Sequence, residues 1–131
     1  MAEAFLDTNV VLQIISASDR KAVRARELID AGALISAQVF NEFVSVARRK
    51  YNISWFGIRE IMAPVMASCR VLALTMETHA LAVQIAEEAM IDIYDANIVA
   101  AAELAGCDTL YTEDLNAGQR IGGVTIRNPF A

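Results

Sequence analysis

The sequence predicts a single domain of the α/β class, a three-layer α/β/α sandwich around a mainly parallel central sheet of four or five strands. Short apolar runs of strand length alternate with longer segments whose apolar residues recur at helical spacing. The 131 residues match the common size of one domain, and no Pro-, Gly- or Ser-rich stretch divides them. Hydrophobic residues make up 56% of the chain, which is enough to build a core without a partner. We therefore expect residues 1–131 to fold as one unit.

The first strand is expected at residues 4–6, a short apolar run of the kind that is buried on both faces of a parallel sheet. Residues 9–16 are apolar enough for a short helix. Residues 21–30 place their apolar side chains at helical spacing and are followed by Gly32, a residue type that commonly ends helices. Residues 33–35 then form the second strand.

An apolar stripe at helical period predicts the next helix at residues 38–49. Ser54 is a suitable N-cap for a further helix. Pro64 should kink or split that helix, because proline removes one of its hydrogen bonds. Residues 71–74 indicate a third strand.

Two more helices are expected in the last third of the chain, at residues 78–90 and 95–104. The second of them is rich in alanine and is followed by Gly106. Residues 109–111 form a fourth strand. Residues 124–126, after a glycine-containing loop, are a candidate for the last strand.

Several classes of protein are excluded by what the chain lacks. No apolar run reaches the roughly 18 to 20 residues that a bilayer span needs, and Met1 to Leu6 lack the basic start of a signal peptide. We therefore expect a cytoplasmic protein with no membrane partner. Cys69 and Cys107 match no Cys-x-x-Cys spacing and are expected to be buried reduced thiols. His79 is the only histidine, and nothing around it indicates a Ser-His-Asp or Cys-His site.

The net charge of −5 argues against a nucleic acid partner, because phosphate binding depends on Lys and Arg. The distribution of charge qualifies that argument, since the basic residues gather in two clusters that are candidates for phosphate contacts. The clusters are Arg20, Lys21, Arg24 and Arg26, and Arg48, Arg49 and Lys50. Several acids, by contrast, lie in apolar surroundings where solubility does not explain them.

Two of these acids follow expected strands. Asp7 comes directly after the first strand, and Asp114 lies three residues beyond Tyr111, where the fourth strand ends. Ligands of open parallel sheets bind at the carboxyl ends of the strands, so both acids should face one crevice. Carboxylates that gather without a Lys repel one another unless a cation joins them, and their hard oxygens suit Mg²⁺ or Mn²⁺. Such an ion leaves room for a phosphate oxygen and a water, which favours phosphodiester hydrolysis.

Each acid also has a purely structural interpretation. Asp7 and Asp95 could cap the helices that follow them. Glu42 could be a solvated residue at the rim of its helix, and Asp114 could be a turn residue. Taken one at a time, none of the four acids establishes a site.

Four short motifs that contain these acids occur in the order and at the intervals of a known family. The motifs are Leu6-Asp7-Thr8-Asn9, Ser36 to Phe43 around Glu42, Asp95 to Ala102, and Leu110 to Leu115. They resemble the motifs of the PIN-domain ribonucleases, in particular the VapC-type toxins of bacterial toxin–antitoxin pairs. The resemblance covers nearly the whole chain and implies a PIN-like version of the predicted fold.

The resemblance assigns catalysis and metal binding to Asp7, Glu42, Asp95 and Asp114. It assigns supporting hydrogen bonds to Thr8, Asn9 and Thr112. Asp92 and Glu113 each neighbour one of the acids. The family's Asp-Ala helix start and Thr-x-Asp spacing favour Asp95 and Asp114, and Asp92 is the stronger of the two substitutes.

The function implied by the resemblance is an endoribonuclease that depends on Mg²⁺ or Mn²⁺ and acts as the toxin of its pair. One or two ions would activate a water for in-line attack on an RNA phosphodiester and stabilise the departing 3′ oxygen. The implied partners are a cognate antitoxin protein and a second copy of the chain in a homodimer. Candidates for a protein interface are Trp55, Phe56, Ile58 and Met62.

The alternative function is a non-catalytic cation-binding or regulatory module, either an inactive PIN scaffold or a receiver-like domain. Receivers also place acids at strand ends, but they need a phosphoacceptor Asp after the third strand and a Lys late in the chain. Here the third strand ends in Leu74 and Thr75, and no Lys follows Lys50. An activity assay distinguishes the inactive scaffold from the enzyme.

Overall fold

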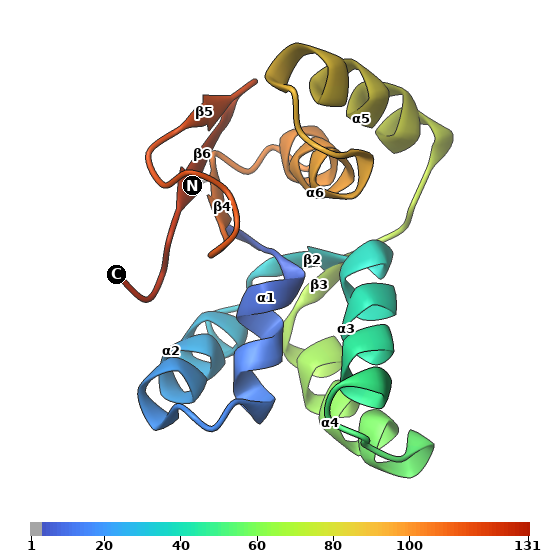
Figure 1. Cartoon of the computed structure of the whole chain (residues 1–131), viewed down its shortest axis with the longest axis vertical. Coiled ribbons are helices and arrows are strands. Elements are labelled where there is room, and N and C mark those ends of the chain that lie inside the picture. The colour runs from blue at the N-terminus through green and yellow to red at the C-terminus, as the bar shows by residue number, and fades with distance from the viewer. Residues whose placement is uncertain (1–3) are drawn as a thin grey trace.

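A computed structural model of the chain describes residues 4–131 and shows a six-stranded sheet between two layers of helices (Figure 1). The strands lie in the order β3-β2-β1-β4-β6-β5, and every neighbouring pair is parallel except β5 with β6. Their bounds are β1 Ala4–Leu6, β2 Leu34–Ser36, β3 Arg70–Leu72, β4 Thr109–Tyr111, β5 Arg120–Ile121 and β6 Val124–Arg127. The predicted three-layer α/β fold with a mainly parallel sheet is therefore confirmed.

The described residues contain one strand more than the sequence predicts. The additional strand is β5, which has only two residues and pairs with β6 in a tight hairpin. Gly122 lies in the turn at a φ of 59°, a left-handed conformation that glycine adopts without steric cost. A strand of two residues is too short to show an alternating pattern, which is why the sequence does not reveal it.

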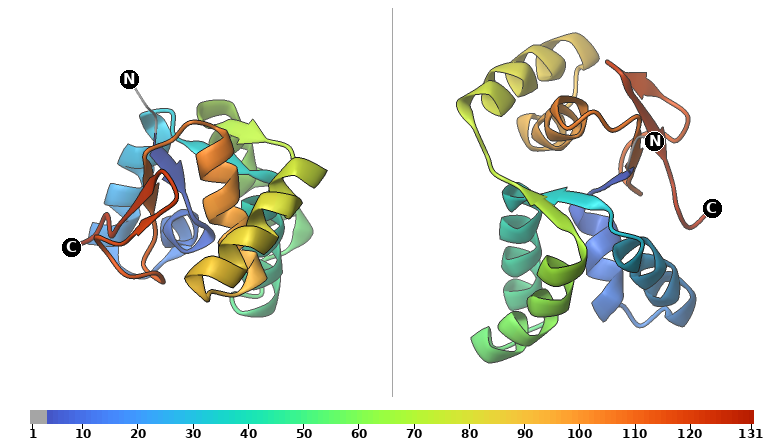
Figure 2. Two further views of the ribbon diagram at one scale, coloured as in Figure 1. Left: turned by 90° about the horizontal axis from the view of Figure 1, so that it is seen from above. Right: turned by 180° about the vertical axis from the view of Figure 1, so that it is seen from behind.

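The helices cover the sheet from both sides. Their bounds are α1 Thr8–Val11, the 3₁₀ helix η1 Leu12–Ile15, α2 Asp19–Asp30, α3 Ala37–Arg49, α4 Trp55–Ser68, α5 Met76–Ala89 and α6 Ile93–Leu104. Helices α1 to α4 lie on one face and α5 and α6 on the other, as the opposite views show (Figures 1 and 2). The segment predicted as one helix at residues 9–16 is thus divided into α1 and η1.

Capping side chains determine where two of the helices begin. Thr75 accepts a hydrogen bond from the backbone N–H of Thr78, and α5 begins directly after Thr75, two residues earlier than predicted. Asp92 accepts one from the backbone N–H of Asp95, and α6 begins directly after Asp92. Asp95 therefore lies in the first turn of α6 and is not its N-cap, so the capping interpretation of Asp95 was wrong.

Helix α4 continues through Pro64 to Ser68, so of the two predicted effects of Pro64 the split was wrong, and the kink stays a prediction. Pro64 has no N–H to offer the carbonyl of Glu60, but Pro64 is exposed, and water can solvate that carbonyl. Ile58 and Val65, one on each side of the break in hydrogen bonding, are both buried in the core. Packing of both halves holds the helix together.

The apolar residues predicted to serve a protein interface divide into two groups. Trp55 and Phe56 are 55% and 69% exposed. Ile58 is only 3% exposed, and Met62 is partly buried against the core. Ile58 is therefore not available to a partner, and its prediction as an interface residue was wrong.

The strands form the centre of the core. Their largest fully buried side chains are Phe5, Leu6, Leu34, Ile35, Leu110 and Ile126. Cys69 and Cys107 are both buried, as predicted. Within residues 4–131, no helix combines the length and the apolar character needed to cross a bilayer.

Candidate metal-binding site

The acidic site is built at the carboxyl ends of β1 and β4, which are neighbours in the sheet. The two strands pair in parallel with Leu6 opposite Tyr111, and the N–H of Asp7 donates to the carbonyl of Tyr111 at 3.0 Å. The residues that follow the two strands, Asp7 and Thr112, therefore leave the sheet at the same edge. This arrangement brings Asp7 close to Asp114 although 107 residues separate them in the sequence.

Three of the four predicted acids meet at this edge. One carboxylate oxygen from each of Asp7, Asp95 and Asp114 lies within 4.8 Å of the others. Asp95 reaches the group from the first turn of α6. Asp7 is buried with 4% exposure, Asp95 is half-buried and Asp114 is exposed. The site is therefore closed at Asp7 and open to solvent at Asp114.

Glu42 lies beside this group but does not belong to the three. It projects from α3, is half-buried, and its Oε1 accepts a hydrogen bond from Oγ1 of Thr8 at 2.9 Å. Its charge acts on Asp7, whose pKa it helps to raise. Glu42 is thus placed at the margin of the acidic group.

A network of hydrogen bonds fixes the carboxylate of Asp7. Its Oδ1 accepts from the N–H of Thr8 at 2.6 Å, and its Oδ2 accepts from Oγ1 of Thr112 at 2.9 Å and from Nδ2 of Asn9 at 3.4 Å. Nδ2 of Asn9 also donates to Oγ1 of Thr112 at 2.9 Å. The side chains of Asn9 and Thr112 and the backbone of Thr8 therefore all contact Asp7, which leaves the carboxylate little freedom to turn.

The loop that carries Asp114 is held by Thr112 next to it and by three residues that are distant in the sequence. The N–H of Asp114 donates to Oγ1 of Thr112 at 3.1 Å, and the N–H of Glu113 donates to Oδ1 of Asn9 at 3.0 Å. The Glu113 carboxylate accepts from Nε2 of Gln13 at 2.9 Å and pairs with Nζ of Lys21 at 2.6 Å. Of the two adjacent acids, Glu113 is paired with the side chain of Lys21, and Asp114 belongs to the group of three.

Asp92, the other candidate substitute, is occupied at the start of α6. Its carboxylate accepts from the N–H of Asp95 at 2.9 Å and is the N-cap of the helix. Asp92 does not belong to the group of three, but its charge contributes to raising the pKa of Asp95 and of Glu42. It therefore adds to the negative potential of the site from outside.

Burial and mutual repulsion raise the pKa of the acids. Burial is the largest cause for Asp7, whose pKa rises to about 6 in spite of hydrogen bonds from Thr112 and Thr8. For Asp95, burial and then the charges of Asp92 and Asp7 raise the pKa to about 7. Burial also raises the pKa of Glu42. The carboxylate forms are therefore destabilised in the folded protein.

No positive side chain relieves this repulsion within residues 4–131. The ion pairs there are Lys21 with Glu113 and Arg24 with Glu27, and neither includes a member of the group of three. The donor set consists of carboxylate oxygens alone, which are the ligands that Mg²⁺ and Mn²⁺ prefer. A divalent cation fits this site both in charge and in ligand type.

Two residues that support the site were missed by sequence reasoning. Gln13 and Lys21 hold Glu113, although 100 and 92 residues separate them from it. Lys21 lies in a basic cluster that predicts phosphate contacts, and nothing in its local sequence indicates an acid as its partner. Contacts between distant segments of this kind carry no local pattern.

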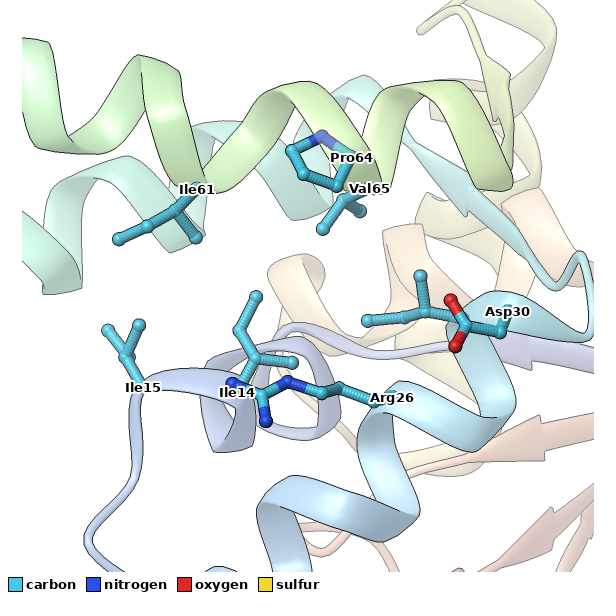
Figure 3. A pocket seen from close by; sticks show the side chains of 8 residues that line it. Ile14, Ile15, Arg26, Asp30, Ile61, Pro64 and Val65 are labelled. Carbon is cyan, nitrogen blue, oxygen red and sulfur yellow. The ribbon is translucent and has the colours of Figure 1, made fainter.

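The apolar pocket between η1, α2 and α4 is separate from the acids (Figure 3). Its volume is about 290 Å³, and Ile14, Ile15, Ile61 and Val65 are among its lining residues. The ionisable side chains in its lining are one base and one acid, Arg26 and Asp30. It has no cluster of carboxylates and is not a metal site.

Comparison with known proteins identifies the family and the fold. The family model of the PIN domain matches residues 4–120. A search of curated proteins gives no significant match. A toxin–antitoxin complex from Klebsiella pneumoniae contains a chain of 23% identity and TM-score 0.71, with 97% of this chain and 98% of that chain covered.

Two further solved structures show the same fold. The DNA-bound VapBC of Salmonella typhimurium contains a chain of 23% identity and TM-score 0.69, with 98% and 99% of the two chains covered. VapC20 of Mycobacterium tuberculosis, described as a sarcin-ricin loop cleaving toxin, has 20% identity and TM-score 0.60, with 86% and 90% covered. At these identities the structures establish a common fold over nearly the whole chain.

Proposed function

This chain belongs to the PIN-domain family, and from that premise we propose that it is a divalent-metal-dependent endoribonuclease that acts as the toxin of a toxin–antitoxin pair. The observation that carries the proposal is the group of three carboxylates, Asp7, Asp95 and Asp114, at the carboxyl edge of the sheet. These acids lie close together without a cation from the protein. A site of this composition suits a metal-assisted hydrolysis of phosphodiester bonds.

The three acids would hold Mg²⁺ or Mn²⁺, with Glu42 at the margin of the site. The bound ion would polarise a phosphate oxygen and lower the pKa of a water, which is the chemistry that carboxylates alone do not provide. Asp114 is exposed, so RNA and water would enter on its side of the site.

The neighbours of the acids would keep the site in one geometry. Thr112 and Asn9 hold one oxygen of Asp7, and the backbone N–H of Thr8 holds the other. The hydroxyl of Thr8 also donates a hydrogen bond to Glu42, which holds that carboxylate at the margin of the site. Fixed carboxylates lose less freedom when a cation and a phosphate bind, and this pre-organisation favours catalysis.

A cognate antitoxin is the proposed protein partner. The support comes from structural neighbours that were solved within toxin–antitoxin complexes, one from Klebsiella pneumoniae and one from Salmonella typhimurium. We also propose that the chain forms a homodimer. A mass of one copy by size exclusion with light scattering at micromolar concentration would contradict the dimer.

The proposed function is tested by measuring RNA cleavage by protein variants in which these acids are replaced. Asp7→Asn and Asp95→Asn should abolish cleavage in Mg²⁺ or Mn²⁺ while the circular dichroism spectrum stays that of the wild type. Asp108→Asn, which changes an exposed aspartate outside the site, is the matched control and should cleave normally. Full activity in either site variant would refute the assignment. A folded wild type that cleaves no RNA with either metal would identify an inactive scaffold.

A further inference from the structure

We propose that the exposed end of α3 and the start of α4 form a docking surface for a single-stranded segment of the RNA substrate. This inference rests on the proposed function, because it takes RNA as the substrate. The surface, called here the basic tip, consists of Arg48, Arg49, Lys50, Tyr51, Trp55 and Phe56. None of these residues belongs to the acidic site.

The basic tip combines cations with large exposed rings. Arg48, Arg49 and Lys50 are consecutive and exposed. Trp55 and Phe56 expose 55% and 69% of their surface a few residues later. Sequence-tolerant binding of single-stranded nucleic acid uses this combination, with phosphates on the cations and bases stacked on the rings.

Contacts within the basic tip hold these groups together. Nη1 of Arg48 donates to the carbonyl of Ile53 at 2.9 Å, and its guanidinium lies 4.5 Å from the centre of the Trp55 ring. Nζ of Lys50 lies 5.7 Å from the centre of the Tyr51 ring. Arg48 thus ties the end of α3 to the connection that leads into α4. Cations and rings are presented side by side before any ligand binds.

The charge of the basic tip favours RNA over a protein as the occupant. Within residues 4–131, no ion pair includes Arg48, Arg49 or Lys50. The whole chain carries a net charge of −5, so three adjacent cations without acidic partners are a local exception. Protein interfaces are enriched in arginine and aromatic residues but depleted in lysine, whereas a phosphate backbone is bound by lysine and arginine alike, so an unbroken run of cations that includes Lys50 favours RNA.

The position of the basic tip connects it with the acidic site. Arg49 follows Glu42 by seven residues, which is about two turns of helix, so both side chains lie on the same side of α3. The rise along the axis is about 10 Å. Helix α3 runs from the sheet to the far end of the molecule, where α4 begins (Figure 1). An RNA strand with one phosphate at the acids can therefore follow α3 to the basic tip.

The experiment measures RNA binding without metal, so that it does not depend on cleavage. Fluorescence anisotropy of a short labelled oligouridine RNA is recorded in EDTA for the wild type and for two variants of the basic tip. Trp55→Ala with Phe56→Ala should weaken binding about tenfold, because stacking of bases is lost. Arg49→Gln with Lys50→Gln should weaken binding and reduce the slope of log affinity against log salt by about 1.4, because each phosphate contact of a single strand contributes about 0.7.

Matched controls come from other exposed positions. Arg70→Gln on β3 and Met76→Ala on α5 remove an exposed cation and an exposed apolar side chain outside the basic tip, and both should bind RNA like the wild type. A double-stranded RNA should be insensitive to the aromatic variant, because its bases are already stacked. Circular dichroism verifies that each variant is folded, and the charge variant keeps the test decisive if the aromatic variant unfolds.

The outcomes separate this inference from the proposed function. Asp95→Asn should lose cleavage and keep RNA binding. Wild-type protein that does not bind oligouridine in EDTA, or basic-tip variants that bind it normally, would overturn the docking surface even if RNA is cleaved. Variants that bind RNA normally but form smaller oligomers in light scattering would overturn it in favour of a protein interface. Binding through the basic tip without any cleavage would contradict the proposed function alone.

Discussion

Helices α2 and α3 both carry clusters of basic residues, but the two clusters differ in what surrounds them. On α2, Arg20 donates to the carbonyl of Phe130, and Arg24 donates to that of Pro129 and pairs with Glu27. Lys21 pairs with Glu113. The cluster at the end of α3 has no acidic partner within residues 4–131. A run of charge on α2 thus becomes an internal clamp, whereas at the end of α3 Arg48 binds a backbone carbonyl and Arg49 and Lys50 form no ion pair within residues 4–131.

The comparison extends to the acids. Glu27 and Glu113 both face a cation of α2, whereas Glu42 on α3 faces other acids. Helix α3 therefore carries uncompensated charge of opposite sign at two places, Glu42 beside the acidic site and Arg49 two turns later. The charge of the half-buried Glu42 costs free energy unless a cation pairs with it, and the exposed Arg49 is accessible to a ligand. We therefore expect α3 rather than α2 to meet the ligand.

The largest effect is expected from Glu42→Gln. This variant removes one negative charge at the margin of the proposed metal site. Loss of a group in such a position typically lowers metal affinity or activity by about 10- to 100-fold. Glu27→Gln on α2 is the control, since Glu27 pairs with Arg24 and lies outside the site. Rates of RNA cleavage at saturating Mn²⁺ measure the difference. Equal losses in both variants would remove the distinction between the two helices.

A second effect separates the two basic clusters by their kinetics. Arg49→Gln with Lys50→Gln should raise KM for RNA about tenfold and leave kcat nearly unchanged, because in the proposed docking these residues would contact the substrate and not the reacting atoms. Arg20→Gln with Arg24→Gln should leave KM unchanged and lower stability, since both arginines bind backbone carbonyls near the C-terminus. Steady-state kinetics and urea unfolding of both double variants provide the measurement. The reverse pattern would show that α2 meets the RNA.

The acids without cation partners should also make stability depend on pH. The pKa is about 6 for Asp7 and about 7 for Asp95, above the value of about 3.9 in an unfolded chain. A raised pKa means that the folded state holds the proton more tightly, so this stabilisation is present at low pH and lost as pH rises through the folded pKa. In EDTA, the advantage in Tm of Asp7→Asn or Asp95→Asn over the wild type should grow by several degrees between about pH 4 and pH 8. A constant difference would show that burial and repulsion do not raise the pKa of these two acids in the folded protein.

The smallest effect is expected from the clamp of α2, here the ion pair of Lys21 with Glu113. Lys21→Met leaves Glu113 without its cation and should lower the free energy of unfolding by about 1 kcal/mol, because the pair is only partly buried. It should also weaken Mn²⁺ binding, since Glu113 anchors the loop that presents Asp114. Lys21→Arg should restore both quantities. Unchanged Mn²⁺ affinity in Lys21→Met, measured by calorimetry, would show that the clamp does not reach the site.

The sequence predicts the parts of this site that follow from strand ends and motifs. Phe5 and Leu6 of the first strand are buried as expected for a central strand, and the end of this strand fixes the position of Asp7. The fourth strand was predicted at its observed bounds, which places Thr112 beside Asp7. Local patterns suffice here because the parallel pairing of neighbouring strands brings their carboxyl ends to the same edge of the sheet.

The remaining features depend on contacts that no local pattern records. The direction of the Glu113 side chain is set by Gln13 and Lys21, from η1 and α2. The start of α6 is set by capping through Asp92, which the helical period of the following residues does not reveal. The difference between the two basic clusters likewise arises from distant groups, such as Phe130 packed against α2.

The central claim is that Asp7, Asp95 and Asp114 bind one divalent cation, and anomalous scattering from crystals grown with Mn²⁺ tests it most directly. We expect a manganese peak among these three carboxylates, and we expect the peak to disappear in Asp95→Asn while the fold is unchanged. The absence of a peak at this position in the wild type, or a peak that persists in Asp95→Asn, would contradict the claim.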